Sequence, residues 1–122
     1  MKKFLIFGIF FAVFLLPAVA GAATYNVRQD GTGNYTTVQA CANAAQAGDT
    51  CLVSAGNYSE SISTARAGTV SGRIYIKAAN SNKPSVNGLS FGHAYVTVDG
   101  FRINNTGTAV SVGGGGSYWE II

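Results

Sequence analysis

The amino-acid sequence predicts an all-β solenoid, a right-handed parallel β-helix of short coils preceded by one short helix. Short β-rich runs have their centres near residues 52, 75, 97 and 120. They recur with a regular period, and a fixed period of this size is typical of a solenoid. The segment 95–98 also aligns with 118–121, one period later. A β-sandwich would give short strands between turns too, but the regular period and the leading helix favour the solenoid.

The N-terminal segment 1–23 has the pattern of a secretory signal peptide. Two lysines precede the apolar run 4–16, which is followed by Pro17 and a group of small residues. Cleavage after Ala20, Ala22 or Ala23 would suit a signal peptidase, because each choice leaves small residues at the two positions that the enzyme reads. The apolar run is shorter than the ~20 residues that a membrane-spanning helix needs. We therefore expect a secreted protein, extracellular or periplasmic, without a membrane contact after cleavage.

The charge of the mature chain excludes two classes of partner. Without the two lysines of the signal peptide, six basic residues face five acidic ones, so the mature chain is nearly neutral. The six cations are scattered along the sequence and do not cluster. Nucleic acid and anionic lipid are therefore not expected as partners.

Before the first repeat, the sequence predicts a short strand, 24–27, a Gly-rich turn and a helix. Thr36 and Gln39 stand three residues apart and fit a capping box. Apolar residues recur at helical spacing on one face: Val38, Cys41, Ala42 and Ala45. Gly48 supplies the stop signal. This helix is weakly hydrophobic and about three turns long, so we expect it to be stable only where it packs on the coils.

From residue 50 onward, β-rich runs replace the helical pattern. The expected main strands are 51–53, 73–78, 95–103 and 118–122. Shorter strands are expected at 84–88, 89–91 and 109–112. The glycines of 113–116 predict a flexible loop. Residues 24–50 would thus form an N-terminal cap and 51–122 the first three or so coils. Because the chain stops inside an expected strand, we expect a longer functional protein.

The two cysteines, Cys41 and Cys51, are expected to form a disulfide, because both follow the signal peptide and reach an oxidising compartment. A metal site is not expected, since two thiolates and the single histidine, His93, do not complete a zinc site. A catalytic thiol is disfavoured as well, because oxidation would consume the nucleophile.

The segments DGTGNYTTVQACANAAQAGDTCLVSAGNYSESI (30–62) and YVTVDGFRI (95–103) resemble the N-terminal part of secreted right-handed parallel β-helix proteins of the pectate-lyase-like superfamily. The resemblance implies that a helix caps the first coil and that the Gly-Asp-Thr turn 48–50 leads into the first core strand. It places Tyr58 and Glu60 in the corner that follows this strand. These motifs indicate the fold and leave the reaction open, because the same scaffold carries lyases, hydrolases, esterases, epimerases and adhesins.

The resemblance implies a protein that acts on or binds polysaccharide, with acidic polysaccharides among the candidates and a lyase-like enzyme as one form. A non-enzymatic surface adhesin is an alternative. A pectin methylesterase is another, because DGTGNYTTVQA (30–40) is similar to the start of those enzymes. The catalytic groups of these families lie on later coils, so no catalytic residue can be assigned here. No cofactor is expected in this segment, although the resemblance allows calcium in a longer protein.

Other chemically suggestive residues have simpler interpretations. Asp99 precedes Gly100, and Asp-Gly is typical of a turn. The segment 30–34 lacks the length and the final Glu of a calcium hand, which leaves a tight connection. Arg73 and Lys77 are cations of the type that a lyase uses as a base, but no clustered acids accompany them, so salt bridges or solvation are expected.

Polar residues on the expected surface complete the candidates. His93 has no recognisable nucleophile near it in the sequence, and we expect it at the surface between coils. Glycosylation sequons begin at three asparagines: Asn34, Asn57 and Asn104.

Overall fold

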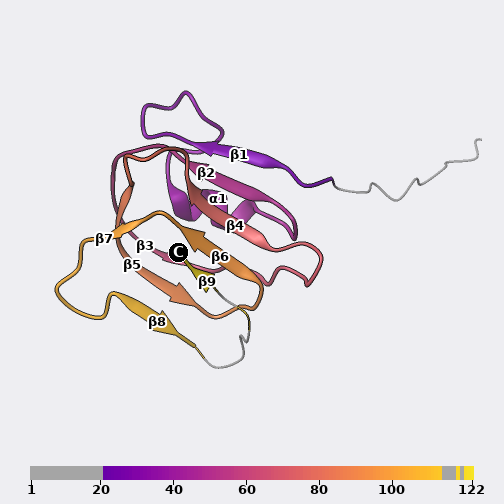
Figure 1. The fold of residues 1–122 in the computed structure, drawn as a ribbon. Helices are drawn as coiled ribbons and strands as arrows, with labels where there is room; N and C mark the ends of the chain where they lie inside the picture. The colour runs from indigo at the N-terminus through magenta and orange to yellow at the C-terminus, as the bar shows by residue number, and fades with distance from the viewer. Residues whose placement is uncertain (1–20, 114–117, 119) are drawn as a thin grey trace, which may run out of the picture.

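The computed structural model describes residues 21–113, 118 and 120–122, and it shows a parallel β-helix of about four turns with one short helix (Figure 1). The predicted signal peptide lies outside the described residues, apart from 21–23. In chain order the elements are β1 (Thr24–Val27), α1 (Val38–Ala44), β2 (Thr50–Val53), β3 (Asn57–Ser63), β4 (Ile74–Ala78), β5 (Ser85–Phe91), β6 (Val96–Asp99), β7 (Arg102–Ile103), β8 (Val110–Val112) and β9 (Glu120–Ile121).

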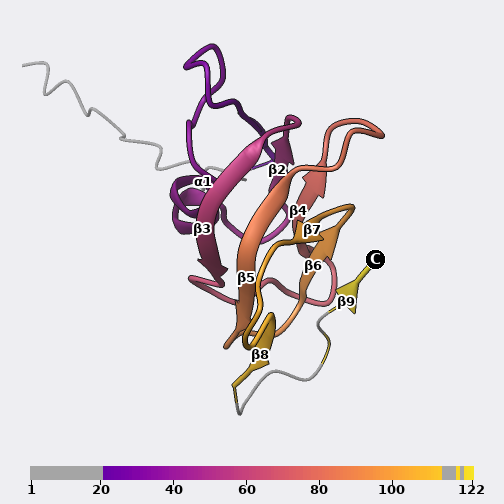
Figure 2. The ribbon, with the colours of Figure 1, turned by 90° about the vertical axis from the view of Figure 1, so that its left-hand side faces the viewer.

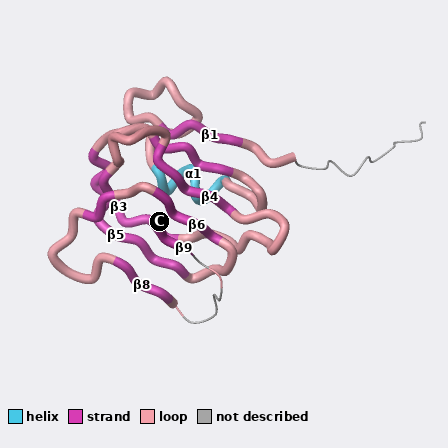
Figure 3. Tube along the Cα trace, in the orientation of Figure 1, coloured by secondary structure: helices cyan, strands magenta, loops and turns pink. Residues whose placement is uncertain are grey.

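The strands form two parallel sheets. In the first turn α1 lies between β1 and β2, and from β2 onward the chain passes from one sheet to the other in each turn. The first sheet has the order β1-β2-β4-β6-β9, and the second has the order β3-β5-β7, with β8 also paired to β5. Figure 2 shows the second sheet beside α1, and Figure 3 shows how small a part of the molecule the helix forms. The predicted fold class is confirmed. Because β1 pairs with β2, the first sheet begins at Thr24, and there are about four turns where three or so coils were expected.

The period of the coils varies along the chain, which corrects the expectation of a constant repeat. Neighbouring strands of the first sheet pair Thr24 with Thr50, Cys51 with Ile76, Ile74 with Val96, and Thr97 with Glu120. The first two of these intervals are longer than the last two, because the first contains helix α1 and the second contains the segment 64–73. The predicted alignment of 95–98 with 118–121 is confirmed by the pairing of β6 with β9.

Helix α1 is one residue out of register with the predicted capping box. Thr37, and not Thr36, is the N-cap, and its side-chain oxygen accepts from the backbone N–H of Ala40 at 3.2 Å. The side chain of Gln39 is turned toward β3, where it accepts from the Ser63 N–H at 2.7 Å, so it cannot complete the box. The helix has seven residues, and Ala45 is its C-cap. Among the described residues, no helix is long and apolar enough to cross a membrane.

Three strand predictions also change. Tyr58 and Glu60 lie within β3, where Tyr58 and Ile62 are buried, and not in a corner. The two short strands expected at 84–88 and 89–91 form one strand, β5. The expected strand 95–103 is divided into β6 and β7, because Gly100 takes a left-handed conformation with φ +80°.

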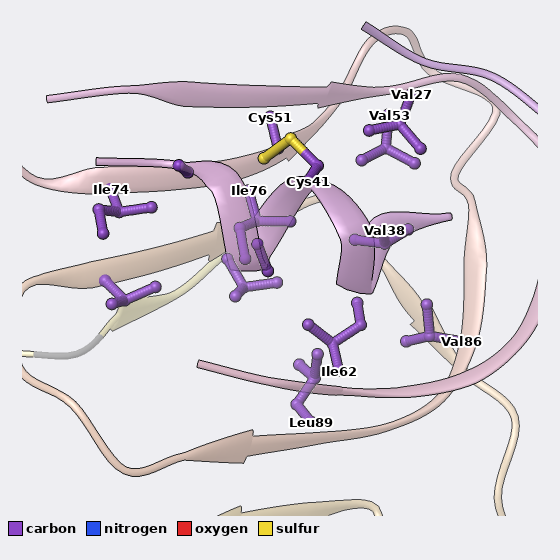
Figure 4. Close-up of a cluster of buried hydrophobic side chains, with 14 of the residues drawn as sticks. Val27, Val38, Cys41, Cys51, Val53, Ile62, Ile74, Ile76, Val86 and Leu89 are labelled. Carbon is purple, nitrogen blue, oxygen red and sulfur yellow. A yellow bond between two sulfur atoms is a disulfide. The ribbon is translucent and has the colours of Figure 1, made fainter. Parts of the chain in front are cut away.

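The core fills the space between the two sheets and the helix (Figure 4). Cys51, Ile76 and Val98 are aligned by the parallel register and are at most 2% exposed. Residues from the second sheet close the other side: Ile62, Val86, Leu89 and Phe91. Helix α1 presents its predicted stripe, Val38, Cys41, Ala42 and Ala45, to this core. Since an isolated helix of this length is unstable in water, it depends on its contacts with the coils, and burial of the stripe is one of them.

Candidate functional site

The first sheet presents polar side chains to solvent, because inward and outward side chains alternate along each strand. In β4, Ile74 and Ile76 are buried, whereas Tyr75 is 37% exposed. The parallel register aligns the outward residues into two rows, first Thr24, Thr50, Tyr75, Thr97 and Glu120, and second Asn26, Leu52, Lys77 and Asp99. We call these two rows, together with Arg73, the outer face.

Arg73 lies directly before β4 and extends across the outer face toward β9. Its Nη1 donates to Thr97 Oγ1 at 2.9 Å and lies 3.7 Å from Glu120 Oε2. Thr97 is only 1% exposed although it belongs to an outward row, which places the guanidinium over it. The expected salt bridge of Arg73 is confirmed. Because Glu120 is more than half exposed, the pair contributes little to stability and its main effect is to neutralise charge on the face.

Lys77 and Asp99 are the other two charged residues of the outer face. They are register partners on the adjacent strands β4 and β6. Neighbouring strands lie about 4.8 Å apart, so the backbones of the two residues are adjacent, but among the described residues no salt bridge joins their side chains. The turn expected after Asp99 is also confirmed, since β6 ends there and Gly100 has positive φ.

Two tyrosines stack where β6 and β9 begin. The rings of Tyr95 and Tyr118 lie 5.1 Å apart at an angle of 6°. Their backbones are linked as well, because the Tyr95 N–H donates to the Tyr118 carbonyl at 3.0 Å. Both residues have positive φ, 57° and 83°, which is uncommon for residues other than glycine. Tyr118 is 63% exposed, so this edge of the sheet offers an accessible aromatic ring.

The two cysteines belong to the core and not to the outer face. Cys41 of α1 and Cys51 of β2 form the predicted disulfide (Figure 4). Their Cα atoms are 6.1 Å apart, and both residues are 0% exposed. The bond joins the helix to the first sheet. It is structural, because no free thiol remains among the described residues.

Two carboxylates have structural roles that sequence reasoning missed. Asp49 of the Gly-Asp-Thr turn is 4% exposed and accepts from the N–H groups of Ala23 at 2.9 Å and Gln46 at 2.8 Å. Glu60 accepts from the N–H of Gln39 in the first turn of α1 at 2.9 Å. This contact resembles helix capping, but Glu60 lies 21 residues after Gln39 in the sequence. A local sequence pattern therefore does not reveal the contact.

The remaining candidates are dispersed. His93 Nδ1 lies 3.0 Å from Thr64 Oγ1, a partner that the sequence did not indicate. In the connection 30–34, Asp30 accepts from the Thr32 hydroxyl at 2.7 Å and from its N–H at 2.9 Å. These hydrogen bonds, with the nearby Arg28, lower the pKa of the Asp30 carboxyl. The segment is the tight connection that was expected.

The three sequon asparagines lie at exposed positions. Asn34 Oδ1 accepts from the Asn26 N–H at 2.8 Å, and Asn57 Oδ1 accepts from the Ser85 hydroxyl at 2.9 Å. Both side-chain oxygens therefore support local structure. Glycosylation at these positions stays a prediction.

Within 21–113 and the few described residues after it, no group of three or more His, Cys, Asp or Glu side chains could hold a metal ion. Comparison with family models, with curated proteins and with solved structures found no match. The function therefore has to be argued from the outer face itself.

Proposed function

We propose that this protein is a secreted carbohydrate-binding β-helix that contacts a polysaccharide through the outer face. The observation that supports this most directly is the exposed ring of Tyr75, which lies on the outer face among residues with hydroxyl, amide and charged groups. A tyrosine ring offers a flat apolar surface to the C–H face of a sugar. The neighbouring polar side chains can meet the hydroxyl groups that project from the sugar's edge.

The charge pattern of the outer face favours an uncharged polysaccharide. Arg73 is paired with Glu120, and Lys77 is the register partner of Asp99, so the two cations of the face are balanced by two carboxylates. An acidic polymer brings regularly spaced negative charges, which would meet these two carboxylates at close range. Like charges at such a distance disfavour binding. The expected preference is therefore for neutral glycans over acidic ones.

The motifs that resemble the pectate-lyase-like superfamily also support a polysaccharide as the ligand class. Proteins on that scaffold include both enzymes and adhesins, so the resemblance alone does not choose between catalysis and binding. Our proposal is limited to binding, because binding needs only the surface that the outer face provides.

Affinity electrophoresis in gels with and without dissolved polysaccharide tests the proposal. We expect a neutral β-glucan or galactomannan to retard the wild-type protein and polygalacturonate to retard it less. Tyr75→Ala should weaken the neutral interaction by roughly tenfold, since aromatic stacking contributes on that scale. Val70→Ala is the control, because Val70 is 81% exposed in the segment before β4 and outside the outer face.

The outcomes separate the two parts of the proposal. Retardation by polygalacturonate in preference to every neutral polymer would contradict the charge argument while leaving carbohydrate binding intact. Absence of retardation by any polysaccharide, or full retention of binding by Tyr75→Ala, would remove the outer face as a glycan-binding surface.

A further inference from the structure

The buried carboxylate of Asp49 has hydrogen-bond partners but, within the described part of the chain, no salt bridge to a side chain. It is 4% exposed, and the two groups that donate to it, the N–H groups of Ala23 and Gln46, are neutral amides. The salt bridge found within the described residues joins Arg73 with Glu120 and lies on another part of the sheet. A buried charge without a compensating charge is costly. A cation close to Asp49 would remove that cost.

The sequence directly before Ala23 offers a source for such a cation. Ala20-Gly21-Ala22 has small residues at the two positions that a signal peptidase reads, with one residue between them. We propose that the signal peptide is cut between Ala22 and Ala23, and that the new α-amino group of Ala23 becomes the counter-ion of Asp49.

The chemistry is the hydrolysis of one peptide bond. Water adds across the Ala22–Ala23 amide, which leaves a carboxylate on the released Ala22 and an amine on Ala23. The amine takes up a proton at neutral pH, because α-amino groups have a pKa near 8. A neutral donor to Asp49 is thereby replaced by a charged one at the same atom.

The structure holds Ala23 in place for this contact without the residues before it. The Ala23 nitrogen lies 2.9 Å from Asp49 Oδ1. The carbonyl of Ala23 accepts from the Thr50 N–H at 2.8 Å, and the next residue, Thr24, pairs with Thr50 in the sheet. In Figure 1 the chain enters β1 along the edge of the first sheet. Hydrolysis changes the Ala23 nitrogen but not the Ala23 carbonyl or the backbone of Thr24, so these two contacts keep the new ammonium group beside the carboxylate.

The other cleavage bonds would not give this ion pair. A cut after Ala20 would leave Gly21 and Ala22 attached, and the donor to Asp49 would remain an amide. A cut after Ala23 would remove both the donor and the carbonyl that Thr50 contacts. The proposal therefore selects one bond among those that the signal sequence permits. It also couples removal of the signal to locking of the first coil.

The first experiment determines the N-terminus of the protein secreted from its full-length precursor, by intact mass and N-terminal sequencing. We expect Ala23 as the first residue. Any other N-terminus in the folded, secreted protein would overturn the proposal.

The second experiment compares the thermal unfolding of three forms released from a fusion by a protease that leaves no extra residue. The first begins at Ala23, the second begins at Gly21, and the third begins at Ala23 but has an acetylated α-amine. We expect the first form to unfold at a temperature about 5 °C higher than the other two. An ion pair of ordinary strength raises the unfolding temperature of a domain of this size by about that amount. Equal unfolding temperatures would overturn the ion pair.

Asp49→Asn provides the matched control. It keeps an acceptor oxygen for Ala23 but removes the charge. In this background we expect the three forms to unfold at the same temperature. A difference that persisted in Asp49→Asn would show that the extra residues act by another contact, and it would contradict the proposed role of the carboxylate.

Discussion

Reduction of the Cys41–Cys51 disulfide should remove a large share of the stability of this domain. The two residues are ten positions apart, and a closed loop of this length stabilises a fold by about 3 kcal/mol on the loop-entropy model. A domain of about a hundred residues has a total free energy of unfolding of about 5–15 kcal/mol. The reduced protein should therefore remain folded under mild conditions but with a clearly smaller margin.

The site of the bond determines which part of the fold is affected first. The disulfide ties α1, a helix of seven residues, to β2 of the first sheet. A helix of that length gains almost nothing from its own hydrogen bonds. Without the bond, α1 is held on the coils by the hydrogen bonds of Gln39 with Glu60 and Ser63 and by the burial of its apolar stripe. We expect α1 to separate from the coils before the strands unfold.

Urea unfolding followed by circular dichroism, with and without a reductant, measures the effect. A change of about 3 kcal/mol corresponds to a fall in the urea midpoint of about 1–3 M for a small domain. The double variant Cys41→Ala/Cys51→Ala is the control, and its midpoint should not respond to the reductant. If complete reduction lowered the free energy of unfolding by less than about 1 kcal/mol, the loop-closure argument would be wrong for this bond.

Three further substitutions probe contacts that the structure shows. Glu60→Ala removes the acceptor of the Gln39 N–H and should lower the free energy of unfolding by about 1–2 kcal/mol in urea titrations; no loss would mean that water replaces the carboxylate. Gly100→Ala puts a side chain at φ +80° with its Cβ 2.9 Å from the Ala78 Cβ, and it should lower the free energy of unfolding by about 2 kcal/mol in the same assay. Gly92→Ala is the control, because its Cβ would meet no atom within 4 Å, and its stability should be close to that of the wild type. Burial, followed by the charges of Glu60 and Asp30, raises the pKa of Tyr58, so the unfolded chain loses the Tyr58 hydroxyl proton before the folded protein does as the pH rises above about 10. Tyr58→Phe should therefore make the loss of stability between pH 9 and 11 shallower. Identical slopes of stability against pH in the two proteins would contradict this assignment.

The sequence predicted the parts of the fold that depend on alternation over a few residues. The buried stripe of α1, which includes Cys41, followed from helix periodicity, and the disulfide with Cys51 followed from the expected oxidising compartment. Strand β1 was predicted with the bounds that the structure shows, Thr24–Val27. Patterns of this kind are local, and neighbouring residues are enough to reveal them.

The contacts that the sequence did not reveal join residues far apart in the chain. Asp49 meets Ala23 across 26 residues, and Glu60 meets Gln39 across 21. The Gly-Asp-Thr motif predicts a turn at Asp49, and nothing in the motif indicates the hydrogen bond to Ala23. The outer face is hidden in the same way, because its members come together only through the parallel register of the coils. The sequence presented Arg73 as an isolated cation, and the register brings it to Glu120.

The β-helix separates the residues that determine the fold from those that we assign to binding. Within β4, Ile74 and Ile76 are buried and their apolar character is required by the core. Tyr75 and Lys77, the residues between and after them, project from the opposite side of the same strand. Exchanging an outward residue leaves the inward rows and the backbone ladder unchanged. The outer face can therefore change its ring or its charged residues at little cost in stability. This separation requires that Tyr75→Ala weaken glycan binding without changing the unfolding temperature.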